Sequence, residues 1–167
     1  MITAQYCRTM AQYNAWQNKG LRENVARLDH AELSRDRGAF FGSILGTLSH
    51  LLWGDQLWMS RFDGGAAPEG GIAQSPTLWA DATVWSTDRF KTDGRISEWA
   101  RHLNDVDLVG DLTWFSGAMN KTVTKPLAFC VAHFFNHQTH HRGQVHALLT
   151  AAGQKPQDTD LFFMPTE

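Results

Sequence analysis

Apolar side chains recur at helical spacing in the first part of the chain. From about Thr3 to Leu28 they return every three to five residues: Tyr6, Met10, Tyr13, Trp16, Leu21, Val25 and Leu28. This spacing is typical of one face of an α-helix and not of a β-strand. The polar segment "LDHAELSRDRGAFFGS" follows and predicts a connection, in which Asp29 and Glu32 are typical of the start of a short turn.

Two further helices are predicted in the middle of the chain. The second extends from about Ser43 to Phe62, and the hydroxyl of Ser43 can cap its first turn. Because this helix is apolar nearly all round, we expect it to be buried. The segment "DGGAAPEGGIAQSP" then predicts a loop. A third helix is predicted from about Thr77 to Leu103, although Gly94 and the polar residues around it weaken the pattern at its centre.

The last third of the chain predicts a small hairpin followed by a fourth helix. Two short runs, Leu112–Phe115 and Lys121–Thr124, flank the turn-like sequence "SGAMN". Pro126 suits the first turn of a helix, which then extends to about Ala152 and ends at Gly153. Since four long helices account for most of the sequence, we expect an all-α fold, a four-helix bundle that forms a single domain over residues 1–167.

Composition narrows the classes of function. At 43% hydrophobic and 19% charged residues, the chain is typical of a globular protein and not of a disordered one. The net charge of −2 and the scattered basic residues give no reason to expect binding to nucleic acid or to an anionic membrane. Two cysteines form no disulfide framework, and neither a signal peptide nor a membrane-spanning segment is evident. We therefore expect a cytoplasmic protein.

Five of the eight histidines lie in the fourth predicted helix, and they face different ways. At about 100° per residue, His141 lies about 40° from His137. The apolar residues of this helix lie in the same direction, so both histidines fall on or beside the buried face. His133 and His140 lie near its edge, and His146 points to the opposite side.

Two imidazoles one turn apart can bind a single metal ion. The alternative is that each is a hydrogen-bonded core histidine. A third candidate is His50, which lies in a strongly apolar segment between Gly46 and Gly54. An unpaired polar group would be costly there, and either a metal or a hydrogen-bond partner would satisfy it. His30 and His102 lie in or near polar connections and are expected at the surface.

Three motifs resemble the DinB/YfiT-like family of four-helix-bundle proteins: "YNAWQNKGL", "TLSHLLWGDQLWMSRF" and "NHQTHHRGQVHALLTAAG". The closing "DTDLFFM" is also similar to the end of this family's sequences. The resemblance implies an up-down-down-up bundle, a homodimer, and a divalent metal held by His50, His137 and His141. Relatives with known activity are mostly thiol-dependent S-transferases, together with a thiol-dependent maleylpyruvate isomerase.

Three hypotheses for the function stay open. A transition metal, with zinc or nickel expected first, would lower the pKa of a thiol or a water molecule. The protein would then transfer a low-molecular-weight thiol to a small electrophile, or it would be a metal-dependent hydrolase. A non-catalytic metal- or ligand-binding module is the third hypothesis, because the sequence identifies no catalytic acid or base. We expect a small-molecule substrate in either enzyme.

Other residues near the predicted site remain ambiguous. Asp55 lies about 140° around the helix from His50, which makes it a poor fourth ligand. Arg142 can hold a substrate or anchor a contact between helices. The aromatic residues of the first two helices can line a pocket or belong to the core: Tyr13, Trp16, Trp53 and Trp58.

Overall fold

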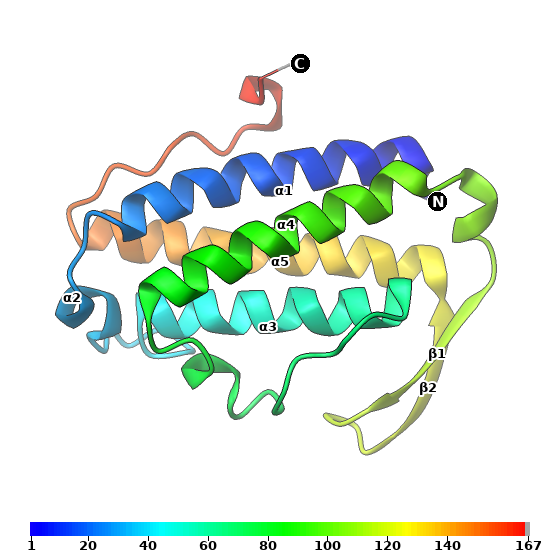
Figure 1. Cartoon of the computed structure of the whole chain (residues 1–167), viewed down its shortest axis with the longest axis horizontal. Helices are drawn as coiled ribbons and strands as arrows, with labels where there is room; N and C mark the ends of the chain where they lie inside the picture. Colours follow the sequence, from blue (N-terminus) through cyan, green and yellow to red (C-terminus); the bar gives the residue numbers. More distant parts are fainter. Residues whose placement is uncertain (166–167) are drawn as a thin grey trace.

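Four long helices lie side by side in the computed structural model, which describes residues 1–165 (Figure 1). They are α1 (Ala4–Val25), α3 (Ile44–Asp63), α4 (Ala82–His102) and α5 (Leu127–Ala151). The short helix α2 (His30–Ser34) connects α1 to α3. A two-stranded sheet, β1 (Asp111–Ser116) and β2 (Lys121–Pro126), precedes α5. The expectation of a mostly helical chain is confirmed.

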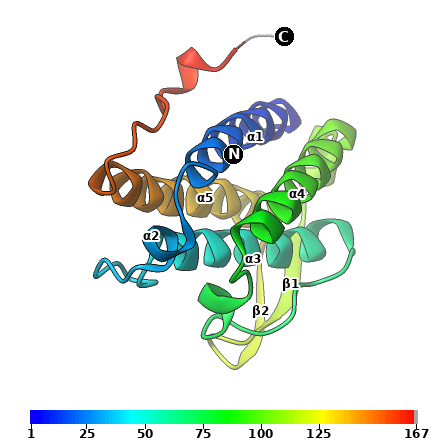
Figure 2. The same ribbon diagram turned by 60° about the vertical axis from the view of Figure 1, so that its left-hand side comes forward.

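Each long helix contacts two others. α1 packs against α4 and α5, and α3 packs against the same two helices (Figure 2). The segment after α5 turns back along α1, where the Gln17 amide donates to the carbonyl of Asp158 and Gln157 donates to the carbonyl of Trp16. This last segment therefore covers part of the outer surface of α1.

Side-chain caps set the starts of the long helices. Thr3, Ser43 and Asp81 each accept a hydrogen bond from the backbone of the first turn that follows. The third helix starts at Ala82, five residues later than the expected Thr77, because the cap is Asp81 and the preceding Ser75–Thr77 forms a 3₁₀ turn. It continues through Gly94 without a break.

The hairpin is present where the sequence predicts it. β1 and β2 pair antiparallel, with Trp114 opposite Val123. The ring of Trp114 lies 5.4 Å from that of Trp58 on α3, with the rings edge to face. This contact anchors the hairpin to one end of the helical body.

The interior has two apolar clusters separated by a polar layer. Residues from all four long helices form one cluster, which includes Leu21, Leu48, Trp85 and Leu149. A second cluster at the other end of the helices also contains residues from all four: Cys7, Ala11, Met59, Ile96, Ala100, Val131, Phe134 and Phe135. Between them lie seven buried polar side chains: Asn14, Asn18, Asp55, Arg89, Asp93, Gln138 and Arg142.

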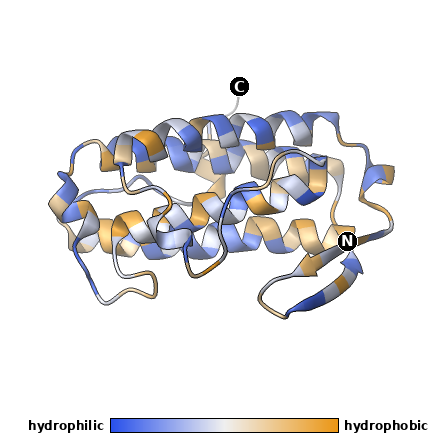
Figure 3. Cartoon of the chain, turned by 60° about the horizontal axis from the view of Figure 1, so that its bottom comes forward, coloured by the Kyte–Doolittle hydropathy of each residue, from blue (hydrophilic) through white to orange (hydrophobic). Residues whose placement is uncertain are grey.

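Because of this polar layer, the helices carry polar residues on their buried faces as well as on their exposed ones. Hydrophilic and hydrophobic residues alternate along them, without separation into long blocks (Figure 3). On α1 the buried face carries Cys7, Ala11 and Asn14, whereas Tyr6, which the apolar pattern placed inward, is 37% exposed. Within residues 1–165, no helix is sufficiently long and apolar to span a membrane.

Candidate metal centre

Three histidines from two neighbouring helices meet beside the polar layer. His50 comes from α3, and His137 and His141 lie one turn apart on α5. Each offers one ring nitrogen such that the three nitrogens lie within 4.8 Å of one another. His50 and His141 are buried, and His137 is half-buried. The structure therefore brings together the three histidines that the sequence singled out.

The tautomer of His50 is assigned by its neighbour Ser75. His50 Nδ1 lies 2.8 Å from Ser75 Oγ, and that hydroxyl donates its proton to the carbonyl of Ile72 at 2.7 Å. Because the hydroxyl has no second proton, it accepts from His50 Nδ1–H. The proton of His50 is thus on Nδ1, and Nε2 keeps a free lone pair, which is the state that a metal ligand requires.

Gln144 plays the same part for His141. His141 Nδ1 lies 2.7 Å from Gln144 Oε1, an amide oxygen that can only accept. The hydrogen bond therefore places the proton of His141 on Nδ1 and leaves Nε2 unprotonated. Gln144 lies one turn beyond His141 on α5, so both groups are positioned by one helix.

The ring of His137 rests on a glycine. A Cβ atom at Gly54 would lie 2.8 Å from His137 Cε1, closer than carbon atoms normally approach, so a larger residue on α3 would displace the ring. The buried Nδ1 of His137 has no hydrogen-bond partner among residues 1–165. A bound cation beside this ring would compensate for the absence of polar partners around it.

Burial keeps all three imidazoles neutral near pH 7. Loss of hydration, reinforced by the neighbouring His141, lowers the pKa of His50 to about 4. Burial, followed by the nearby histidines, lowers the pKa of His137 to about 3. The pKa of His141 is also lowered, mainly by burial. Neutral imidazole is the form that binds metals, so no proton needs to leave these rings first.

Aromatic side chains lie against two of the three rings, those of His50 and His141. Phe41, in the connection before α3, stacks on His50 with 3.8 Å between ring centroids, and it lies 5.5 Å from His141. Trp53, one turn along α3, lies 5.9 Å from His50. An apolar wall limits access of water and strengthens electrostatic interactions at the site.

The polar layer lies directly behind the histidines. Asp55 Oδ1 accepts from Gln138 and Asp55 Oδ2 accepts from Arg89 at 2.6 Å, so both oxygens of its carboxylate already have hydrogen-bond partners on α5 and α4. Arg89 also binds Asp93 at 2.9 Å. Arg142, the residue after His141, is buried and donates to Asn14. It therefore anchors a contact between helices.

The remaining candidates lie outside the three-histidine group. His133 and His140 are exposed on α5, the former edge to face against Trp58 at 5.2 Å. His146 borders a small cavity under the C-terminal segment. Trp16 lines a groove between α1 and α4, which none of the three histidines borders. The ring of Tyr13 packs against the guanidinium of Arg142. His30 and His102 are exposed, as expected.

Sequence reasoning missed Ser75 and the polar layer. Ser75 is in a Gly- and Pro-rich connection, 25 residues from His50, and no periodicity marks it. Gln138 and Arg142, next to the ligand candidates in sequence, were detectable as polar residues on a largely apolar helix face. Their partners, Asp55 on α3 and Asn14 on α1, were not.

The donor set fits a divalent transition metal. Three neutral imidazoles suit zinc, nickel, iron or copper, and three protein ligands leave coordination positions free for a small molecule. A fixed Nδ1–H tautomer at two of the rings and a glycine cradle at the third are features of a prepared site. The three histidines can therefore hold a metal.

Two kinds of comparison find similar proteins. The model of the DinB family matches residues 1–167. The crystal structure of a DinB-like protein from Bacillus cereus ATCC 10987 superposes with a TM-score of 0.64 at 19% identity, covering 87% of this chain and 90% of that one. At this identity the similarity concerns the fold. A search of curated proteins finds no match.

Proposed function

The chain belongs to the DinB family, and from this premise we propose that it is a metal-dependent enzyme that transfers a low-molecular-weight thiol to a small electrophile. The observation that carries the proposal is the convergence of His50, His137 and His141, three neutral imidazoles that no fourth ligand from residues 1–165 joins. A closed structural metal site would present four protein ligands, whereas three are typical of a catalytic one.

We also propose the finer features that the family resemblance implies. Helices α1 and α5 run in one direction and α3 and α4 in the other in Figure 1, which supports an up-down-down-up bundle. Zinc or nickel is the proposed metal, held by His50, His137 and His141. A homodimer is the proposed assembly, which light scattering on the purified protein tests directly.

In the proposed reaction, the side chains of the site bind the metal and orient its ligands, and none is assigned a proton transfer. A divalent metal supplies a Lewis acid that makes a thiol or a water molecule more acidic at neutral pH. Ser75 and Gln144 hold two of the imidazoles in their ligand tautomers. Phe41 and Trp53 provide an apolar wall that limits competing water.

The overall reaction forms one bond and breaks another. The thiol sulfur forms a bond to an electrophilic carbon, the bond from that carbon to its leaving group breaks, and the thiol proton passes to solvent. With 1-chloro-2,4-dinitrobenzene as electrophile, the leaving group is chloride and the product is a thioether with a strong absorbance.

A thiol screen tests the proposed activity. Zinc- and nickel-loaded protein is incubated with this electrophile and, in turn, with glutathione, cysteine and other small thiols. We expect product only with particular thiols. The rate should fall to the uncatalysed level in His141→Ala, whereas His146→Ala should retain the wild-type rate. Turnover without any thiol would contradict the proposal and support a hydrolase. Metal binding without turnover of either kind would also contradict it and would support a non-catalytic binding module.

A further inference from the structure

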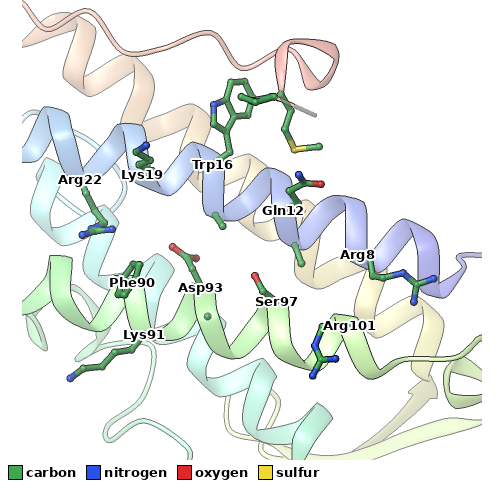
Figure 4. A pocket seen from close by; sticks show the side chains of 15 residues that line it. Arg8, Gln12, Trp16, Lys19, Arg22, Phe90, Lys91, Asp93, Ser97 and Arg101 are labelled. Carbon is green, nitrogen blue, oxygen red and sulfur yellow. The ribbon is translucent and has the colours of Figure 1, made fainter. Parts of the chain in front are cut away.

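A groove on the other side of the molecule is large enough for a ligand of its own. It lies between α1 and α4, has a volume of about 740 Å³, and none of the three candidate metal ligands lines it (Figure 4). Volumes of this order are typical of sites for small molecules. The end of the described chain, Met164 and Pro165, contributes to its wall.

The two ends of the groove are positively charged. Lys19, Arg22 and Lys91 lie toward one end, and Arg8 and Arg101 toward the other (Figure 4). Lys91 and Arg101 have carboxylate partners on their own helix, Asp88 and Glu98.

The other three cations lack such partners. Within residues 1–165, Arg8, Lys19 and Arg22 form no ion pair. Among residues 1–165, the one carboxylate in the lining is Asp93, which is already bound to Arg89. The groove therefore has an excess of positive charge in a chain whose formal net charge is −2.

The floor and walls between the charged ends are apolar. Ala11, Ala15 and Gly94 form a floor of small residues where the helices approach. Trp16 and Phe90 add aromatic surface, and the ring of Phe90 is 65% exposed. The guanidinium of Arg22 lies 5.1 Å from the centre of this ring. Apolar surface beside unpaired cations is complementary to a molecule with an apolar body and a negative group.

We propose that this groove binds a small amphipathic organic anion, with its apolar body on the floor between α1 and α4 and its carboxylate, sulfonate or phosphate at Lys19 and Arg22. A second copy of the chain is a poor occupant. In a two-fold symmetric contact through this face, the five cations of one copy would face the same five cations of the other. Like charges at an interface oppose association.

Charge dependence is tested with a matched pair of probes. The first is 8-anilinonaphthalene-1-sulfonate, and the second is N-phenyl-1-naphthylamine, which has the same aromatic body without the sulfonate. Fluorescence titration of the chelator-treated protein should give one sulfonate probe per chain, bound at least about tenfold more tightly than the neutral probe. Equal affinity for the two probes would overturn the proposal. Since no metal is present, this result is independent of the proposed enzyme activity.

Two variants locate the bound probe. A Cβ at Gly94 meets no atom within 4 Å, so Gly94→Phe fills the groove without a clash in the backbone, and Lys19→Glu reverses the charge of one unpaired cation. Each should weaken binding of the sulfonate probe about tenfold or more. The matched controls Gly143→Phe, also in open space on α5, and Lys125→Glu on the exposed hairpin should leave it unchanged.

The remaining outcomes are also decisive. Unchanged affinity in both groove variants, or equal losses in the controls, would overturn the proposal. Circular dichroism melting curves check that Gly94→Phe folds, and Lys19→Glu, at a solvent-facing position, tests the same site if it does not. If the wild type is a dimer and Gly94→Phe or Lys19→Glu changes that state, the groove is an interface between copies and not a ligand site.

Discussion

At the scale of single residues, the candidate metal centre depends on the partners of its histidines. Ser75 and Gln144 accept hydrogen bonds from the Nδ1–H groups of His50 and His141. His137 has no such partner in the described part of the chain, residues 1–165, and its position depends on the absence of a side chain at Gly54. Small changes at these supporting residues should therefore affect metal binding without removing a ligand.

Ser75→Ala tests this dependence. The variant removes the acceptor for His50 Nδ1–H, so the ring is no longer held in its ligand tautomer. We therefore expect zinc to bind about 10- to 100-fold more weakly, still at one site per chain. Calorimetric titration measures both quantities. Ser60→Ala, which removes a hydroxyl on α3 that bonds only to Leu57, is the control and should bind zinc as the wild type does. Equal affinity in Ser75→Ala and wild type would refute the role of Ser75.

His137 and His141 could be selected from the sequence because helical periodicity fixes direction, and His50 because it lies in a strongly apolar segment. An angle of about 100° per residue placed His137 and His141 on the buried face and His146 opposite. Ser75 could not be found in this way. It acts from a connection without periodic structure, and only the packing of that connection against α3 brings it to His50.

At the scale of elements, α4 shows why a polar pattern is hard to interpret. Its central residues are polar, which weakened the predicted helix around Gly94. In the structure Arg89 and Asp93 are buried there, and Arg89 pairs both with Asp93 and with Asp55 of α3. The partners lie on other helices, so the sequence of α4 alone cannot distinguish this buried layer from a solvated face.

Arg89→Met tests the energetic importance of the layer. The variant leaves the carboxylates of Asp55 and Asp93 buried without their cation, and we expect the free energy of unfolding to fall by about 3–5 kcal/mol. Arg95→Met is a matched control, because Arg95 also pairs with an aspartate of α3, Asp63, but at the surface. It should cost no more than about 1 kcal/mol. Urea unfolding that gives similar losses for both variants would contradict a structural role of the layer.

At the scale of the whole molecule, burial of the histidines predicts a dependence of stability on pH. The pKa values of His50 and His137 are lowered to about 4 and about 3, against about 6.5 in an unfolded chain. As the pH falls below about 6.5, the unfolded chain takes up protons that the folded chain does not, so the folded state loses stability. The loss should continue toward pH 4.

Unfolding of the chelator-treated protein measures this effect. The urea midpoint should fall steadily between about pH 7 and pH 5, a range above the ordinary pKa of the carboxylic acids. The double variant His50→Gln/His137→Gln lacks the two groups and should show a shallower fall. A midpoint that does not change over this range, or an equally steep fall in the double variant, would show that the two rings are not buried as the structure places them.

Much of the whole-molecule arrangement followed from local pattern. The cap at Ser43, the hairpin before α5 and the positive φ of Gly153 after it agree with the sequence signals. The start of α4 and the exposure of Tyr6 differ from what the sequence pattern predicted. The start of α4 is set by its Asp81 cap and the 3₁₀ turn before it, whereas the orientation of Tyr6 depends on how the helices pack, since the buried face of α1 includes small and polar residues that apolar periodicity does not detect.

The central claim is that His50, His137 and His141 together bind one divalent metal. Isothermal titration of zinc into chelator-treated protein tests it most directly, with wild type, His50→Ala, His141→Ala and His146→Ala compared. We expect about one zinc per chain for wild type and His146→Ala, and loss of this site in the other two variants. No binding by the wild type, or equal loss in His146→Ala, would contradict it.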